Sequence, residues 1–279
     1  MALVALASVG CASLDEKQRE WIFQPGERTW SGATAAAEGL EDVWIDYADS
    51  QGSAVRLHGL WLPAAEPEGA PVLLYLHGAR FDVRGSAPRI RRMQQLGFSV
   101  LAVDYRGFGR SSKALPSEAS AAEDARAAWD WLAAKHAESR RYVYGHSLGG
   151  AIAVELASQV QQQAAGLIVE ASFPSIPDVV SSFKWGWLPV GPLITQRFEA
   201  GERIGSLKMP VLVVHGSEDR LIPPALGRAL YDKAPEPKRF VLVEGGSHHS
   251  AGALGQRQVR EALAELFDIK PRGVDAAGG

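Results

Sequence analysis

Ser147 stands where a strand-like apolar run meets an Ala-rich run of helical character, in the pattern Gly145-His146-Ser147-Leu148-Gly149. A serine at a sharp turn between a strand and a helix is the context of a nucleophile elbow. Glycine on both sides suits this turn, because side chains beside Ser147 would collide with neighbouring backbone. The N-terminus of the helix favours negative charge, and the N–H of Leu148 can donate to a developing oxyanion. The pattern predicts that Ser147 is a nucleophile.

A serine hydroxyl is a good nucleophile only when a base takes its proton and a carboxylate orients that base. Asp219 and His248 each follow an apolar, strand-like run of their own, and His248 lies in the glycine-containing stretch GGSHHS. We therefore expect His248 to accept the proton of Ser147 and Asp219 to orient His248. The alternatives are His249 as the base and three other carboxylates as the acid: Glu218, Glu170 and Asp178.

The loop after the third predicted strand, which reads LHGARFD, is expected to supply a second N–H for the oxyanion. Gly78 allows the backbone of this loop to approach a substrate closely. The N–H of Ala79 is the candidate donor, and that of Arg80 is next in line. Together with Leu148, Ala79 would form the oxyanion hole.

Short β-branched runs alternate with longer Ala-rich segments from Val43 onward, which is typical of a mostly parallel sheet flanked by helices. The first two runs are expected to pair antiparallel. Ser120 and Glu123 have capping-box spacing and predict the start of a helix. The eight predicted strands are 43–47, 54–62, 71–77, 98–104, 141–145, 166–171, 210–216 and 239–244.

The alternation is interrupted longest at about 173–209, a segment rich in aromatic residues, Gly and Pro that we interpret as a small cap. Residues 12–40 form an N-terminal extension, 41–270 the α/β domain that carries this cap, and 271–279 a disordered tail. Four apolar residues in the cap either line a substrate pocket or pack the cap onto the sheet: Phe183, Trp185, Trp187 and Leu188.

Composition excludes several classes of function. The net charge of −3 and the scattered Lys and Arg residues give no basic stripe, so we do not expect nucleic-acid binding. Cys11 is the only cysteine, which leaves no intramolecular disulfide and no cysteine-rich metal site. The His248-His249 pair lacks a third ligand at a suitable spacing, so we expect neither a metal site nor a cofactor.

The N-terminal stretch MALVALASVGC changes abruptly from apolar to charged residues and resembles a bacterial lipoprotein signal. The resemblance implies a signal at residues 1–11, lipidation of Cys11 and a lipid-anchored protein of the bacterial cell envelope. The alternative is a weakly apolar N-terminus on a cytoplasmic protein.

Five motifs resemble those of the α/β-hydrolase superfamily, in its serine aminopeptidase-like and BEM46-like branch. They are LHG at 76–78, DYRGFGRSS at 104–112, GHSLGG at 145–150, HGSEDRLIPP at 215–224 and EGGSHH at 244–249. The chain order Ser147, Asp219, His248 is also that of this superfamily.

The resemblance implies transfer of an acyl group to water through an acyl-enzyme. The expected substrate is a carboxylic ester, which includes small-molecule esters and lipid acyl esters, or a thioester. The alternatives are an amidase or peptidase that uses the same three residues, and a catalytically silent binding protein of the same fold.

Overall fold

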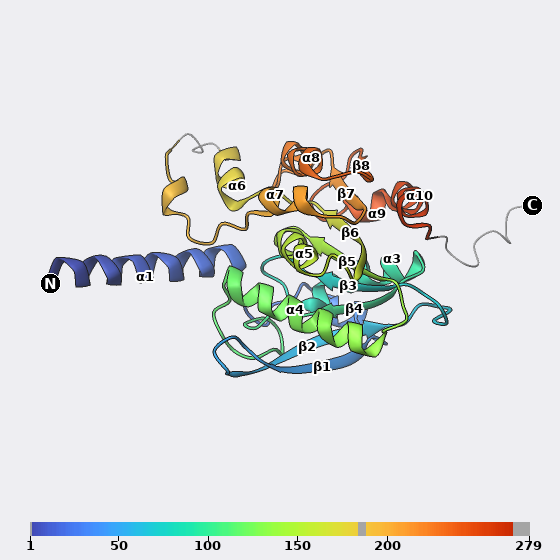
Figure 1. The fold of residues 1–279 in the computed structure, drawn as a ribbon, viewed down its shortest axis with the longest axis horizontal. Coiled ribbons are helices and arrows are strands. Elements are labelled where there is room, and N and C mark those ends of the chain that lie inside the picture. The colour runs from blue at the N-terminus through green and yellow to red at the C-terminus, as the bar shows by residue number, and fades with distance from the viewer. Residues whose placement is uncertain (1, 184–187, 270–279) are drawn as a thin grey trace, which may run out of the picture.

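The computed structural model describes residues 2–183 and 188–269, and its eight strands form one sheet in the order β1-β2-β4-β3-β5-β6-β7-β8 (Figure 1). Strand β2 pairs antiparallel with β1 and β4, and the other neighbouring strands are parallel. This topology confirms the predicted fold class. The strands are β1 Glu41–Ala48, β2 Ala54–Leu62, β3 Val72–Leu76, β4 Ser99–Val103, β5 Arg141–His146, β6 Ala164–Glu170, β7 Val211–Gly216 and β8 Lys238–Val243.

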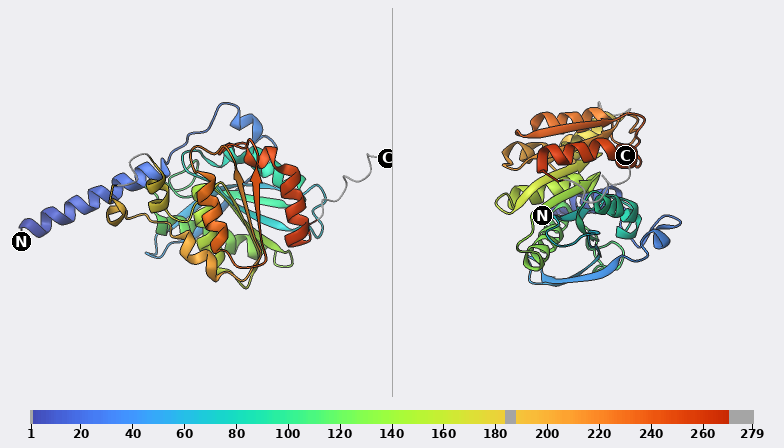
Figure 2. Two further views of the ribbon diagram at one scale, coloured as in Figure 1. Left: turned by 90° about the horizontal axis from the view of Figure 1, so that it is seen from above. Right: turned by 90° about the vertical axis from the view of Figure 1, so that its right-hand side faces the viewer.

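Helices cover both faces of the sheet (Figure 2). Strands β3, β4 and β7 are buried along their whole length, as their continuously apolar sequences require. One face packs a core cluster with α4, α5 and α8, and the other packs a second cluster with α3, α9 and α10. The bounds are α3 Ala87–Gln95, α4 Glu118–Lys135, α5 Leu148–Gln159, α8 Pro224–Lys233, α9 Ala251–Leu254 and α10 Gln256–Phe267, with a short α2 at Ala33–Ala36 and a 3₁₀ turn, η1, at Val83–Ser86.

Helix α4 begins earlier than its sequence spacing predicts. Ser117 is the N-cap in extended conformation, and its hydroxyl accepts the N–H of Ser120 at 3.1 Å, while the Ser120 hydroxyl accepts the N–H of Ser117 at 2.8 Å. The expected Ser120–Glu123 pair is therefore wrong. Glu123 instead forms an ion pair with Arg106 at 3.0 Å, which anchors α4 to the loop after β4.

Between β6 and β7, the described residues 171–183 and 188–210 form short elements: α6 Ile176–Ser182, η2 Gly191–Leu193, α7 Ala200–Arg203 and η3 Ile204–Ser206. This segment corresponds to the predicted cap at about 173–209, and it lies beside the C-terminal part of helix α1, Ala2–Phe23 (Figure 1).

Helix α1 extends away from the body of the molecule at its N-terminal end (Figures 1 and 2). Its C-terminal half is hydrogen-bonded to the cap. The side-chain amide of Gln18 donates to the carbonyl of Leu193 at 2.7 Å, and the Asp15 carboxylate accepts from the Thr195 hydroxyl at 2.7 Å. Among the described residues, no helix is both long and apolar enough to span a membrane.

Phe23, the last residue of α1, is fully buried between the cap and the body. Its ring lies 5.8 Å from that of Phe198 in the cap and 6.5 Å from that of Phe108 in the loop after β4. We expect Phe23→Ala to lower the free energy of unfolding by about 3 kcal/mol, because it leaves a cavity among these rings. Urea denaturation measures this change.

The matched control is Trp21→Ala on the same helix, because Trp21 is 59% exposed. Its effect should stay within about 0.5 kcal/mol. Equal effects of the two substitutions would contradict a packing role for Phe23.

Candidate active site

Ser147 occupies the turn between β5 and α5 in a backbone conformation that non-glycine residues rarely adopt, with φ 56° and ψ −124°. The chain passes itself so closely here that glycine is required. A Cβ on Gly145 would lie 2.1 Å from the carbonyl oxygen of Gly149, and a Cβ on Gly149 would lie 2.2 Å from that of Leu76. The sharp strand–turn–helix geometry predicted at Ser147 is therefore present, and it holds the Ser147 side chain at the carboxyl end of the parallel strands.

His248 joins Ser147 to Asp219. Its Nε2 lies 3.0 Å from Ser147 Oγ, and its Nδ1 lies 2.7 Å from Asp219 Oδ2. A carboxylate only accepts hydrogen bonds, so Nδ1 carries the proton and Nε2 is free to accept from the serine hydroxyl. The structure thus brings the three predicted residues together in the arrangement that general-base activation of a serine needs.

Asp219 is buried and its carboxylate is well supplied with donors. Oδ1 accepts the N–H groups of Leu221 at 2.9 Å and Ile222 at 2.8 Å. Burial acts to raise the pKa of Asp219, but hydrogen bonds from His215, His248 and Ile222 outweigh it and hold the pKa below the ordinary value. Asp219 is therefore an anion beside the imidazole.

The loop that carries Ala79 passes directly against the nucleophile. A Cβ on Gly78 would lie 3.1 Å from Ser147 Cβ, so only glycine fits without displacement. His77 Nδ1 lies 2.6 Å from the Gly78 carbonyl oxygen and donates to it. Because the peptide bond is planar and trans, this contact turns the N–H of Ala79 to the opposite side, away from the His77 ring.

Arg80 is engaged elsewhere. Its N–H donates to the carbonyl of Phe23 at 2.9 Å, and its own φ is 80°. This contact leaves Ala79 as the candidate donor from this loop. The role of Ala79 and Leu148 as an oxyanion hole stays a prediction.

A family profile described as serine aminopeptidase, S33 matches residues 67–198 and 195–252, which is more than half of the chain. The chain belongs to this family. It is accordingly a hydrolase of the α/β-hydrolase superfamily, as its motifs and fold indicate.

Individual proteins are also similar to this chain. An uncharacterized protein of Mycobacterium tuberculosis is 34% identical over 270 residues, covering 96% of this chain and 93% of that protein. Lysophosphatidylserine lipase ABHD12 of Danio rerio is 30% identical over 196 residues, covering 64% of this chain and 51% of the lipase. This chain therefore aligns with about half the length of that lipase. The esterase Pf2001 of Pyrococcus furiosus has a similar fold, with a TM-score of 0.67, 18% identity and coverage of 88% of this chain and 97% of that one.

In this member of the serine aminopeptidase family, the alternative base and acids are not hydrogen-bonded toward Ser147 as His248 and Asp219 are. His249 is exposed. Among the acids, Glu170 pairs with Arg89 at 3.3 Å, Asp178 accepts the Ser175 hydroxyl at 2.5 Å, and Glu218 is exposed beside Asp219. Of these candidates, only His248 and Asp219 make the two hydrogen bonds that lead to Ser147.

Sequence analysis missed Arg89, which lies on α3 with its guanidinium 2.9 Å from Nε2 of His146, next to the nucleophile. The sequence carries no signal for this role, because Arg89 is one of four arginines in the segment 84–92 and no motif distinguishes it from the others. Over the described ranges 2–183 and 188–269, no group of three or more His, Cys, Asp or Glu side chains is arranged to hold a metal ion.

The tentative substrate-binding residues are only partly described. Phe183 and Leu188 are exposed, at 43% and 41%, and Trp185 and Trp187 lie outside the described residues. Both alternatives for these residues, contact with a substrate and packing of the cap, therefore stay predictions.

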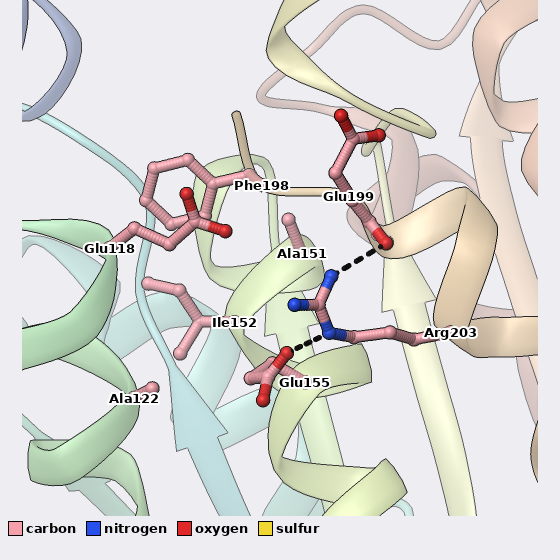
Figure 3. Close-up of a pocket in the computed structure, with 9 residues that line it drawn as sticks. Glu118, Ala122, Ala151, Ile152, Glu155, Phe198, Glu199 and Arg203 are labelled. Carbon is pink, nitrogen blue, oxygen red and sulfur yellow. Dashed lines mark hydrogen bonds and ion pairs between the residues drawn. The ribbon is translucent and has the colours of Figure 1, made fainter. Parts of the chain in front are cut away.

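A pocket between α4, α5 and α7 does not include the nucleophile (Figure 3). Arg203 crosses it to form an ion pair with Glu155 and donates to the Glu199 carbonyl at 3.0 Å (Figure 3). Its lining residues on α5 begin at Ala151, about 6 Å along the helix from Ser147. The pocket is lined by Glu118, Ala122, Ala151, Ile152, Glu155, Phe198, Glu199, Ala200 and Arg203.

The lowered pKa of Asp219 makes stability depend on pH. Its ordinary value is 3.8, and the folded value is lower, so the folded protein binds fewer protons than the unfolded chain between the two. The stabilisation is fully present above the ordinary value and is lost as pH falls through the folded value. We expect the free energy of unfolding to fall from about pH 5 to about pH 3, and to fall less in Asp219→Asn.

Urea denaturation at several pH values in this range measures both slopes. Asp130→Asn is the control, because Asp130 is 54% exposed in a surface pair with Arg126. It should keep the wild-type slope. Identical slopes for wild type and Asp219→Asn would show that Asp219 does not contribute.

Proposed function

We propose that this protein is a serine hydrolase that cleaves a carboxylic ester through an acyl-enzyme on Ser147. The observation that carries the proposal is the pair of hydrogen bonds made by His248, 3.0 Å to Ser147 Oγ and 2.7 Å to Asp219 Oδ2. Both bonds are short enough for proton transfer and for orientation of the imidazole in the resting protein.

In the first half of the reaction, Ser147 Oγ bonds to the ester carbonyl carbon while His248 Nε2 takes the hydroxyl proton. Asp219 stabilises the imidazolium, and the N–H groups of Leu148 and Ala79 donate to the oxyanion. The carbon–oxygen bond to the alcohol then breaks, and the imidazolium gives its proton to the leaving alkoxide. In the second half, His248 takes a proton from water, water attacks the acyl carbon, and Ser147 recovers its proton as the acid departs.

An ester is favoured over a peptide amide because the named relatives include a lysophosphatidylserine lipase and an esterase. The apolar side chains of Phe183 and Leu188 on the cap are suited to an acyl chain. A lipid acyl ester is the substrate that best fits both observations.

Labelling with a fluorophosphonate probe tests the nucleophile. We expect the wild-type protein to be labelled on Ser147, because the activated hydroxyl attacks the phosphorus. Ser147→Ala and His248→Ala should each lose labelling and reduce hydrolysis of p-nitrophenyl butyrate by about 10⁴-fold or more. Peptide mass spectrometry identifies the modified residue.

The matched control is His249→Ala, which removes the neighbouring, exposed histidine and should leave labelling near the wild-type rate. A folded wild-type protein that is neither labelled nor active on esters of any chain length would refute the proposal and favour a silent binding protein.

We further propose that Cys11 is lipidated and anchors the protein to a bacterial membrane. Cys11 precedes Asp15, whose carboxylate binds the cap residue Thr195, by four positions. Along a helix this separation is about 6 Å. Anchoring at Cys11 would therefore hold the cap close to the bilayer, where a lipid ester lies.

Mass spectrometry of the protein purified from its native host tests this anchor. We expect a mature chain that begins at a diacylglyceryl-modified Cys11, and a Cys11→Ser variant that is neither processed nor retained in the membrane fraction. An intact chain that begins at Met1 in the wild type would contradict the anchor and leave the hydrolase proposal untouched.

A further inference from the structure

Arg89 reaches from α3 toward the ends of β5 and β6, behind the loop that carries His248. Its side chain is only 12% exposed, and its charge is balanced by the buried carboxylate of Glu170, with Nε 3.3 Å from Oε1. Glu170 also accepts the hydroxyl of Tyr144, and its backbone carbonyl accepts the N–H of Ser147 at 2.9 Å. The buried pair therefore sits directly against the backbone of the nucleophile.

One guanidinium nitrogen of Arg89 faces three acceptors of the site. Nη2 lies 2.9 Å from His146 Nε2, 3.4 Å from the His248 carbonyl oxygen and 3.3 Å from the His249 carbonyl oxygen. His146 precedes Ser147 in the chain, and His248 and His249 lie in the loop that carries the base. Arg89 thus joins the nucleophile turn to the histidine loop.

The chemistry of arginine fixes the protonation of His146. A guanidinium only donates, so Nε2 of His146 must present a lone pair and the ring must be neutral with its proton on Nδ1. Burial lowers the pKa of His146, and the positive charge of Arg89 lowers it further. His146 Nε2 also lies 3.0 Å from the His248 carbonyl oxygen, and it would donate there only in the other tautomer. In the tautomer that accepts from Arg89, the carbonyls of His248 and His249 take their hydrogen bonds from Arg89.

We propose that Arg89 is a positioning residue, which holds the backbone of His248 and His249 so that the His248 ring faces Ser147. The inference rests on the proposed function. Other hydrogen bonds hold both ends of this loop: the N–H of Gly245 donates to the Ser217 hydroxyl at 2.9 Å, and the N–H of Ala251 donates to the Ser247 carbonyl at 3.1 Å. Arg89 contacts the part between them, at the carbonyls of His248 and His249. A displacement of the base by about 1 Å can cost on the order of 100-fold in rate.

Arg89→Met removes the donor, but it leaves Glu170 buried without its partner and is expected to destabilise the fold. The decisive variant is therefore Arg89→Met/Glu170→Gln, which removes both charges and keeps an acceptor for Tyr144. We expect it to retain a melting temperature near that of the wild type and to lose about 10- to 100-fold in kcat on p-nitrophenyl butyrate, with KM nearly unchanged.

Arg91→Met is the matched control. Arg91 lies on the same helix and also donates to two backbone carbonyls, those of Ala36 and Glu38 in the N-terminal extension, remote from Ser147. It should keep the wild-type kcat. A folded double variant with wild-type kcat would overturn the positioning role, as would a loss in Arg91→Met equal to that in the double variant.

Imidazole ¹⁵N NMR gives a second readout that does not need activity, and its wild-type part needs no variant. In the wild type we expect His146 to be neutral with an unprotonated Nε2, and in the double variant we expect a change in the His248 Nδ1–H resonance. A protonated Nε2 on His146 in the wild type would overturn the proposal. A wild-type protein without esterase activity but with these spectra would refute the proposed function alone.

Discussion

The close passage of backbone at the start of α5 is the constraint on which the rest of the site depends. At Gly145 and Gly149 the chain leaves no space for a side chain, and Ser147 between them is forced to a positive φ. A strained turn of this kind persists only when its surroundings over-determine it. Here the surroundings are the fully buried strand β3 on one side and β6 on the other, whose Glu170 carbonyl accepts the N–H of Ser147. The sheet therefore stabilises the conformation that exposes the hydroxyl.

The parallel sheet then brings Asp219 and His248 to Ser147 through short loops. Strands β5, β6, β7 and β8 are adjacent and parallel, so the loops that follow them open at one edge. Asp219 follows β7 and His248 follows β8, and each needs only a short loop to reach the end of β5. A compact hydrogen-bonded turn fixes Asp219, because its own carboxylate accepts the N–H groups of Leu221 and Ile222. The orientation of the acid is thus local, whereas that of the base is not.

This difference explains how much could be predicted from the sequence. The strands and the residues Ser147, Asp219 and His248 follow from local signals: continuous apolar runs, glycines at a turn, and polar groups after strands. The N-cap of α4 was misplaced because Ser117 and Ser120 both carry hydroxyls and only the backbone conformation decides between them. The packing of α1 through Gln18 and Phe23 joins residues far apart in the chain, so no periodic pattern in the sequence predicts it. Arg89 is likewise one arginine among several until the fold places it beside His146.

A buried ion pair such as Arg89 and Glu170 adds little net free energy to folding, because desolvation of both charges offsets much of their attraction. An apolar pair of similar size would pack the same volume, but it would leave the His249 carbonyl without the donor that Arg89 supplies. Arginine alone offers several donors in a fixed plane, so it can satisfy a carboxylate with one nitrogen and the loop with another. Glu170 in turn bridges this cation to Tyr144 and to the strand whose carbonyl holds Ser147. The polar network therefore couples the position of the base to that of the nucleophile, a coupling that hydrophobic packing could not provide with the same directionality.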